Sequence, residues 1–349
     1  MAPMSGLTGF YASQDWFNLL AAHARPAGTI ACPLLLRVAG APVALLPLWR
    51  QGRALSSQTT VYSALYQPLI LAEATPDAMW QAGRALGRFW KGGWGHGCIR
   101  LDALPEESQV LAALLTGARQ AGLRVRRFAH FGNWHAPVAG LSWAAYLASR
   151  PGALRETVRR RLRQAARDPT IAIEIVREPA DLALALAAYA QIYARSWKQP
   201  EPYPDFIPAL ARLAAERGIL RLGVLRVAGQ PAAAQLWIVA DGEASVLKLA
   251  HDEAFAAHSP GTVLTARMIQ HLLDSERINE LDFGRGDDPY KQLWTTRRRQ
   301  RVGVLLIDAW QPAGLATLLR HDLGQLWGQL WGQLRNRLRN RLRRRRLGT

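Results

Sequence analysis

The feature that most constrains the fold is a short motif that occurs twice, RVAGAPVA at 37–44 and RVAGQPAA at 226–233. Each copy follows a leucine-rich run and precedes a second apolar run that ends near a tryptophan, Trp49 or Trp237. Two apolar runs joined by an Ala-Gly-x-Pro turn are typical of a β-hairpin. The copies lie about 190 residues apart in a chain of 349, so the motif indicates a duplicated domain or two unrelated hairpins.

Alternating apolar patterns around both copies predict an α/β fold. In the second half we expect strands at Ile171–Val176, Leu220–Val227, Ala232–Ala240, Ala244–Ala250, Ile278–Phe283 and Val302–Ala309, and helices at Asp181–Trp197, Phe206–Arg217 and 260–274. In the first half we expect helices at Gln14–His23, Asp77–Trp90 and 106–121, a hairpin over 34–49, and strands at Tyr66–Ala72, Cys98–Leu101 and Leu123–Phe128.

The formal charge of +18 is concentrated in three segments. Residues 150–168 carry seven Arg against two acids, 285–301 carry six Lys and Arg against two acids, and 320–349 carry nine Arg against one acid. Such patches are typical of contacts with phosphates, nucleic acid or anionic membranes. Because they lie apart in the sequence, they are open to different functions.

Two cysteines, Cys32 and Cys98, provide neither a disulfide framework nor a Cys-rich metal site. We see no signal-peptide pattern and no apolar stretch of about 18 residues that would cross a membrane. We therefore expect a cytoplasmic protein.

The segment 245–273, SVLKLAHDEAFAAHSPGTVLTARMIQHLL, predicts a strand, a loop and a helix that begins in Ser-Pro-Gly. We expect Ser259 to cap the helix with its side chain, Pro260 to occupy the first position, and Gly261 to let a ligand approach the backbone. The first-turn amides, those of Gly261, Thr262 and Val263, would then form an anion site suited to a pyrophosphate. A purely structural helix cap is the alternative.

Three segments resemble the CelD-type acetyltransferases of the GNAT superfamily: SWK (196–198), KLAHDEAFAAHSPGTVL (248–264) and LDFGRGDDPYKQLW (281–294). This branch is linked to cellulose and exopolysaccharide genes and is related to the Fem-type aminoacyl transferases. The resemblance covers about 150–310 and implies tandem GNAT-like domains, each a mixed central sheet flanked by helices. The expected divisions are a degenerate copy without CoA at 1–140, an Arg-rich connector helix at 141–170, a catalytic domain at 171–311 and a basic helical tail at 312–349.

The resemblance also implies how the donor, acetyl-CoA or another acyl-CoA, is bound. Backbone amides near Leu249 and Ala250 would polarise the thioester carbonyl. The loop of His258, Ser259, Pro260, Gly261 and Thr262 would hold the pyrophosphate.

Acyl transfer to an amine also needs a base and a proton donor. Candidate bases are His251, Asp252 and Asp287. Tyr290 would protonate the leaving thiolate and Lys291 would stabilise negative charge, while Trp197, Lys198 and Arg285 would contact the substrate. Each of these residues also has a structural alternative, as a cap, a turn residue or a core side chain. The spacing of His251, His258 and His271 fits no usual metal-ligand pattern, so we expect no metal.

The two remaining basic segments are open to several interpretations. Residues 155–167 form a basic helix with one apolar stripe, either a linker or a contact for a polyanion or tRNA. From 325 the tail repeats QLWG, QLWG, QLRN, RLRN and RLRR, typical either of a solvated extension or of an element for an anionic membrane surface.

These observations favour an acyl-CoA-dependent N-acyltransferase that acts on an amine acceptor in exopolysaccharide or cell-envelope metabolism. If the tail binds lipid, we expect the protein to be peripheral to the inner membrane. Two alternatives remain: a Fem-like transferase that uses aminoacyl-tRNA, and a non-catalytic adaptor associated with the membrane.

Overall fold

The computed structural model describes residues 9–70, 75–91, 97–324 and 327. The strands are β1 (Ile30–Ala31), β2 (Leu34–Val38), β3 (Ala41–Leu46), β4 (Leu48–Gln51), β5 (Ala54–Ser57), β6 (Leu69–Ile70), β7 (Cys98–Pro105), β8 (Arg124–Pro137), β9 (Ile171–Val176), β10 (Leu220–Val227), β11 (Gln230–Ala240), β12 (Glu243–His251), β13 (Glu280–Arg285) and β14 (Arg297–Ile307). The α-helices are α1 (Gln14–His23), α2 (Pro76–Phe89), α3 (Gln109–Gln120), α4 (Trp143–Ala148), α5 (Gly152–Arg167), α6 (Leu182–Ala194), α7 (Phe206–Glu216), α8 (Pro260–His271) and α9 (Lys291–Trp294). Short helices lie at η1 (Phe10–Ala12), η3 (Pro179–Asp181), η4 (Glu253–His258) and η5 (Leu272–Glu276).

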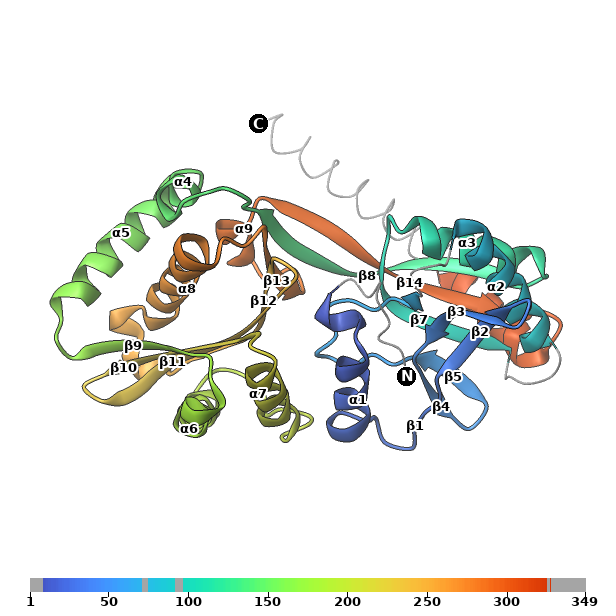
Figure 1. The fold of residues 1–349 in the computed structure, drawn as a ribbon, viewed down its shortest axis with the longest axis horizontal. Helices are drawn as coiled ribbons and strands as arrows, with labels where there is room; N and C mark the ends of the chain where they lie inside the picture. Colours follow the sequence, from blue (N-terminus) through green and yellow to red (C-terminus); the bar gives the residue numbers. More distant parts are fainter. Residues whose placement is uncertain (1–8, 71–74, 92–96, 325–326, 328–349) are drawn as a thin grey trace, which may run out of the picture.

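One mixed sheet of eleven strands runs through both halves of the molecule, in the order β1-β4-β5-β7-β14-β8-β13-β12-β11-β10-β9 (Figure 1). We call residues 9–137 the N-terminal half and 143–307 the C-terminal half. Each half contains one parallel strand pair, β5 with β7 and β12 with β13, among antiparallel neighbours. The fold is therefore α/β with two similar halves, as expected, although the two expected sheets are joined into one.

The halves are joined because they exchange strands. β14 is the last strand of the C-terminal half in sequence, yet it lies between β7 and β8 of the N-terminal half. β8 in turn pairs with β13 of the C-terminal half, at Pro137 with Glu280 and Ala136 with Leu281. Figure 1 shows these two long strands passing from one half to the other.

Both copies of the repeated motif form hairpins, which confirms that prediction. Each turn has two residues of positive φ, Ala39 with Gly40 and Ala228 with Gly229, as a two-residue turn of the type I′ class requires. The β10–β11 hairpin lies within the large sheet. The β2–β3 hairpin instead forms a separate sheet with β6.

Two prolines explain why the first hairpin leaves the large sheet. Pro33 separates β1 from β2, and Pro47 separates β3 from β4. Proline has no amide hydrogen to donate to a strand ladder and restricts the residue before it. Each long strand is therefore broken in two: β1 and β4 stay in the large sheet while β2 and β3 turn away from it.

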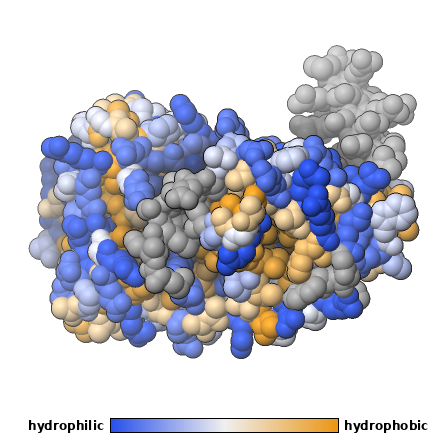
Figure 2. Space-filling model, turned by 45° about the vertical axis from the view of Figure 1, so that its right-hand side comes forward, coloured by the Kyte–Doolittle hydropathy of each residue, from blue (hydrophilic) through white to orange (hydrophobic). Residues whose placement is uncertain are grey.

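Helices cover both faces of the sheet in the C-terminal half, with α5 and α8 on one side and α6 and α7 on the other (Figure 1). α1 packs beside α7, where Trp16 and Phe206 meet edge to face with centroids 5.8 Å apart. A continuous buried apolar cluster includes residues of both halves. Burial of this shared apolar surface holds the halves together. Figure 2 shows hydrophilic side chains over much of one face, with apolar patches between them.

Most expected elements of the C-terminal half are present within a few residues of their predicted limits. The largest difference is β14, which begins at Arg297 rather than Val302; within this extension Arg299 reaches past β8 and pairs with Glu280 and Asp282 of β13. None of the described helices is long and apolar enough to cross a membrane. The repeats that begin at residue 325 lie almost wholly outside the described residues.

Candidate active site

The parallel strands β12 and β13 pair over only three positions and then separate. Their last paired residues are Ser245 and Asp282. A bulge at Leu247 bends β12 against β11. Gly284 lies close to β12, since a Cβ atom there would be 2.9 Å from the carbonyl oxygen of Val246, and its φ of 67° favours glycine. Beyond this point the two strand ends enclose an open space.

α8 begins at the end of β12, after the short helix η4. Ser259 precedes it in the left-handed conformation and makes no side-chain cap, so the predicted serine cap is wrong. The first helical hydrogen bond is donated by Val263 N to Ser259 O at 3.1 Å. Consequently Val263 N is engaged, and the amides of Gly261 and Thr262 precede the first helical hydrogen bond. Two of the three expected anion-binding amides remain available.

Buried side chains fix this first turn against the sheet. Gln235 of β11 donates to Thr265 Oγ1 at 2.7 Å and to Gly261 O at 3.3 Å. Trp237 Nε1 donates to Gln235 Oε1 at 3.0 Å, which orients the amide. The start of α8 is therefore held rigidly, as a binding site for a phosphate group requires.

The corresponding helix start in the N-terminal half carries its own cap and its own acid. The hydroxyl of Thr75 caps α2 by accepting from Ala78 N at 3.2 Å. Asp77 adds a carboxylate to the first turn, so its charge already complements the helix dipole. The first turn of α2 thus differs from the uncapped first turn of α8.

A cavity of about 190 Å³ lies where β12 and β13 separate. The predicted residues that line it are Lys198, Leu249, Arg285, Tyr290 and Lys291. The N-terminal half contributes Tyr11, Val61, Tyr62 and Ala64 to its wall. The site is therefore built by both halves, although only the C-terminal half carries the sequence motifs.

The cavity is rich in positive charge. Lys198, Lys248, Arg285 and Lys291 line it against one acid, Asp288. Lys291 is buried and donates to Arg285 O at 2.6 Å, and it pairs with Asp288 at 3.1 Å, so it stabilises the turn after β13. Lys198 and Arg285 form no ion pair within the described part of the chain. These two cations are available to an anionic ligand.

Burial and the neighbouring Lys248 hold the pKa of Lys198 below its usual range. Burial raises the pKa of Tyr290 well above its usual range, and the nearby carboxylate of Asp288 acts in the same direction. Tyr290 therefore stays protonated at neutral pH, and its phenol is a weaker acid than that of a free tyrosine.

A network around Glu201 connects the halves beside the cavity. Tyr62 of the N-terminal half donates to Glu201 Oε2 at 2.6 Å, and Lys248 of β12 pairs with Glu201 Oε1 at 2.7 Å. The ammonium of Lys248 also lies 4.6 Å from the centroid of the Tyr62 ring. The network fixes the wall that the N-terminal half contributes.

His251 ends β12 and lies against the start of α8. A Cβ atom on Gly261 would be 3.3 Å from His251 Nδ1. The ring of Trp197 contacts the histidine with centroids 4.5 Å apart, and burial lowers the pKa of His251. The neutral imidazole is therefore favoured near pH 7, as a general base requires.

The two predicted acids do not line this cavity. Asp252 is buried and caps η4 by accepting from Ala254 N at 2.9 Å, with Arg195 3.7 Å from its other oxygen. Asp287 forms a bidentate ion pair with Arg298 at 2.6 and 2.8 Å. This pairing holds the pKa of Asp287 below its usual range. The geometry of both acids favours structural roles.

Three acids beside the paired part of β12 and β13 lie within 4.8 Å of one another, Glu243, Glu280 and Asp282. Arg299 of β14 occupies the space among them and lies 2.9 Å from Glu280. A cation of the protein thus already compensates part of the charge of the cluster. Burial raises the pKa of Glu243, and the nearby carboxylate of Asp282 acts in the same direction. We interpret the cluster as a connection between exchanged strands.

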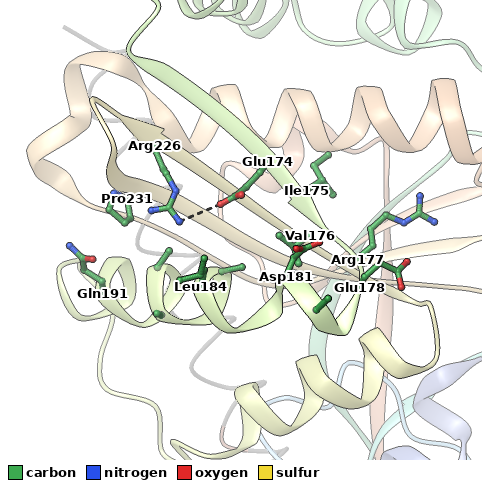
Figure 3. Close-up of a pocket in the computed structure, with 14 residues that line it drawn as sticks. Glu174, Ile175, Val176, Arg177, Glu178, Asp181, Leu184, Gln191, Arg226 and Pro231 are labelled. Atoms are coloured by element: carbon green, nitrogen blue, oxygen red, sulfur yellow. Dashed lines mark hydrogen bonds and ion pairs between the residues drawn. The ribbon is translucent and has the colours of Figure 1, made fainter.

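A larger cavity, about 960 Å³, lies between α6 and the edge strand β9 (Figure 3). Its most prominent polar contact is the exposed pair of Arg226 and Glu174 at 3.3 Å. None of the predicted site residues lines it. We therefore place the candidate site in the smaller cavity.

Several site residues were not predicted from the sequence. Lys248 and Asp288 lie within the segments 248–264 and 281–294 that resemble the CelD-type enzymes, so their positions could have indicated a role. Tyr11 and Tyr62 carry no such signal, because they reach the cavity only through the packing of one half on the other. Glu201 lies outside the motifs and was identified only by its contacts with Tyr62 and Lys248.

Comparison with known families is consistent with this geometry. Residues 152–292 match the acetyltransferase (GNAT) domain. The GNAT match extends from α5 to α9 and includes β12, α8 and β13, so it supports an acyltransferase. A comparison with curated protein sequences gave no match.

Solved structures show the same fold over most of the chain. FemX is 10% identical with a TM-score of 0.56, over 84% of this chain and 96% of FemX. The C-terminal domain of a protein from Agrobacterium fabrum, described as a lysylphosphatidylglycerol synthetase, is 17% identical with a TM-score of 0.52, over 83% and 87%. L-PGS from Bacillus licheniformis is 12% identical with a TM-score of 0.52, over 84% and 91%.

Proposed function

We propose that the chain transfers an acyl group from a thioester, acetyl-CoA or another acyl-CoA, to an amine in the cytoplasm. The observation that carries this proposal is the open first turn of α8 at the end of the separated strands β12 and β13. In this proposal 171–311 is the catalytic domain, 1–140 a degenerate copy that completes the cavity wall, 141–170 a connector and 312–349 a basic tail.

In the proposed mechanism the donor lies along β12. The loop of His258, Ser259, Pro260, Gly261 and Thr262 binds the pyrophosphate, through amides at the positive end of the helix. Backbone amides near Leu249 and Ala250 stabilise the oxyanion that forms when the amine attacks the thioester carbonyl.

His251 is the base that the geometry favours, because Asp252 and Asp287 are engaged elsewhere. It accepts the proton that the acceptor amine must lose. When the intermediate collapses, the carbon–sulfur bond breaks and the phenol of Tyr290 gives its proton to the leaving thiolate. Lys291 holds the turn that positions Tyr290 and stabilises negative charge beside it.

On the acceptor side, Lys198 and Arg285 line the cavity and Trp197 contacts the proposed base, His251. Two cations without ion-pair partners favour an amine that also carries an anionic group. Such acceptors suit exopolysaccharide or cell-envelope metabolism, which the resemblance to CelD-type enzymes and the similarity to a lysylphosphatidylglycerol synthetase also support.

Calorimetric titration with acetyl-CoA and with longer acyl-CoA tests the proposal. Gly261→Glu would place a carboxylate at the proposed pyrophosphate site, and we expect it to abolish binding. Gly152→Glu is the matched control, because it makes the same change near the start of α5, where the nearest side-chain atom is 3.9 Å from the new Cβ. Absence of binding to any acyl-CoA, or equal binding by both variants, would refute the proposal.

A Fem-like transferase that uses aminoacyl-tRNA is the second candidate. The fold shared with FemX favours it, as does α5, whose exposed arginines, including Arg159 and Arg160, form no ion pair within the described part of the chain. It predicts steeply salt-dependent tRNA binding and transfer that stops after nuclease treatment. Turnover of acyl-CoA by nuclease-treated protein would argue against it. A non-catalytic adaptor would transfer no group from acyl-CoA or from aminoacyl-tRNA.

A further inference from the structure

Exposed large apolar side chains are concentrated at the C-terminal end of the described chain. Thirteen such side chains are exposed among the described residues, and five of them lie within 310–327. They are Trp310, Leu315, Leu319, Leu323 and Trp327, with 85, 46, 53, 62 and 66% of their surface exposed. Scattered exposed leucines are ordinary, but a cluster of this kind marks an interaction surface.

Three of these residues, Leu315, Leu319 and Leu323, form one stripe, and Trp327 continues the same spacing in the sequence. Residues 312–324 are helical, and Leu315, Leu319, Leu323 and Trp327 follow one another at intervals of four. Side chains four apart lie on the same side of a helix and drift by about 40° per step. The stripe therefore winds gently along one side of the helix, exposed to solvent throughout.

The helix is fixed to the protein at positions opposite and beside this stripe. Gly314 is buried against the backbone, and a Cβ there would lie 2.0 Å from Asp308 O. Asp322 forms a bidentate ion pair with Arg126 of β8, with both distances 2.8 Å. The attachment determines which side faces outward, so the exposed stripe is a property of the folded molecule.

The charge of the surrounding sequence identifies the kind of partner. Asp322 is the sole acid after Asp308 in the 349-residue sequence, and Arg126 neutralises it. The sequence from 328 to 349 contains eight arginines and no acid. Leucine and tryptophan beside many arginines suit the boundary between headgroups and acyl chains of an anionic bilayer.

We propose that the exposed apolar side chains of 310–324, together with Trp327, form an amphipathic membrane-binding element that docks on anionic lipid. The leucines and Trp327 insert between the headgroups, and the positive charge of the sequence that follows favours anionic over neutral lipid. This inference is independent of the proposed acyl transfer.

The test is sedimentation of the full-length protein with phosphatidylcholine vesicles that contain about one third phosphatidylglycerol, and with pure phosphatidylcholine vesicles. We expect binding to the first only, weakened by salt because surface charges are screened. The triple variant Leu315→Gln, Leu319→Gln, Leu323→Gln, which changes no charge, should bind at least about tenfold more weakly. Leu184→Gln is the control, because Leu184 is 78% exposed on α6 and should not affect binding.

Thermal melting of each variant checks that it remains folded, as substitutions at exposed positions should allow. The inference is wrong if the wild-type protein does not bind the anionic vesicles, or if the triple variant binds as tightly as the control. It is also wrong if the stripe instead joins two copies, so that the wild type is a dimer without vesicle binding and the triple variant a monomer.

Discussion

Replacing Glu201 by Gln should destabilise the protein substantially, because it leaves Lys248 without its counter-ion. The side chains of Lys248 and Glu201 are only 16 and 10% exposed, and their closest atoms are 2.7 Å apart. Removal of one partner of a buried ion pair costs about 3–5 kcal/mol. Glutamine keeps an oxygen that can accept from Tyr62, so we expect a loss of about 2–4 kcal/mol in the free energy of unfolding.

The assay is urea denaturation followed by tryptophan fluorescence, with comparison of midpoint and slope. Glu174→Gln is the control, because Glu174 pairs with Arg226 at an exposed site with side chains 49 and 26% exposed. Such a pair contributes about 0–1 kcal/mol. The double variant Glu201→Gln, Lys248→Met should recover much of the loss, since it removes the unpaired charge. Equal effects of Glu201→Gln and Glu174→Gln would refute the reasoning.

Two further predictions concern the proposed base. Asp287→Asn should reduce the rate of acyl transfer by less than about threefold, because the acid pairs with Arg298; a loss of about a hundredfold or more would instead identify Asp287 as the base. Burial depresses the pKa of His251 in the folded state, so its neutral form dominates at pH 7 and acyl transfer should fall only when the pH drops below the usual histidine range. The unfolded state binds this proton more readily than the folded state. The free energy of unfolding should therefore decrease as the pH falls through the pKa of the unfolded state, and level off below the pKa of the folded state. His251→Gln should remove this pH-dependent component from the free energy of unfolding measured by urea titration.

The C-terminal half was largely predictable because its patterns are local. The alternation in Ile171–Val176, the Ala-Gly turns and the Pro-Gly helix start each determine a structure over a few residues. The serine cap was not predictable: a left-handed residue at Ser259 lets α8 begin immediately after η4 ends, so the hydroxyl makes no cap.

Features that depend on contacts between distant residues could not be predicted from the sequence, for a different reason. Residues 297–301 have a composition typical of a solvated loop, yet they form a strand because Asp282 and Glu280 from another strand neutralise Arg299. Tyr62 reaches the cavity only because the halves pack together. Pro33 and Pro47 could be read from the sequence. Their effect, which is that the β2–β3 hairpin joins a second sheet, depends on strand pairings that the sequence does not reveal.

The exchange of β8 and β14 limits which parts of such a chain can be lost during evolution. A gene fragment that encoded only 152–292 would lack both strands, leaving the edge of β13 unpaired and the cavity without Tyr11 and Tyr62. The N-terminal half therefore cannot be deleted without loss of these strands and of part of the cavity wall. Any selection that preserves the cavity also preserves the strands of the N-terminal half, so the two halves are inherited as one unit.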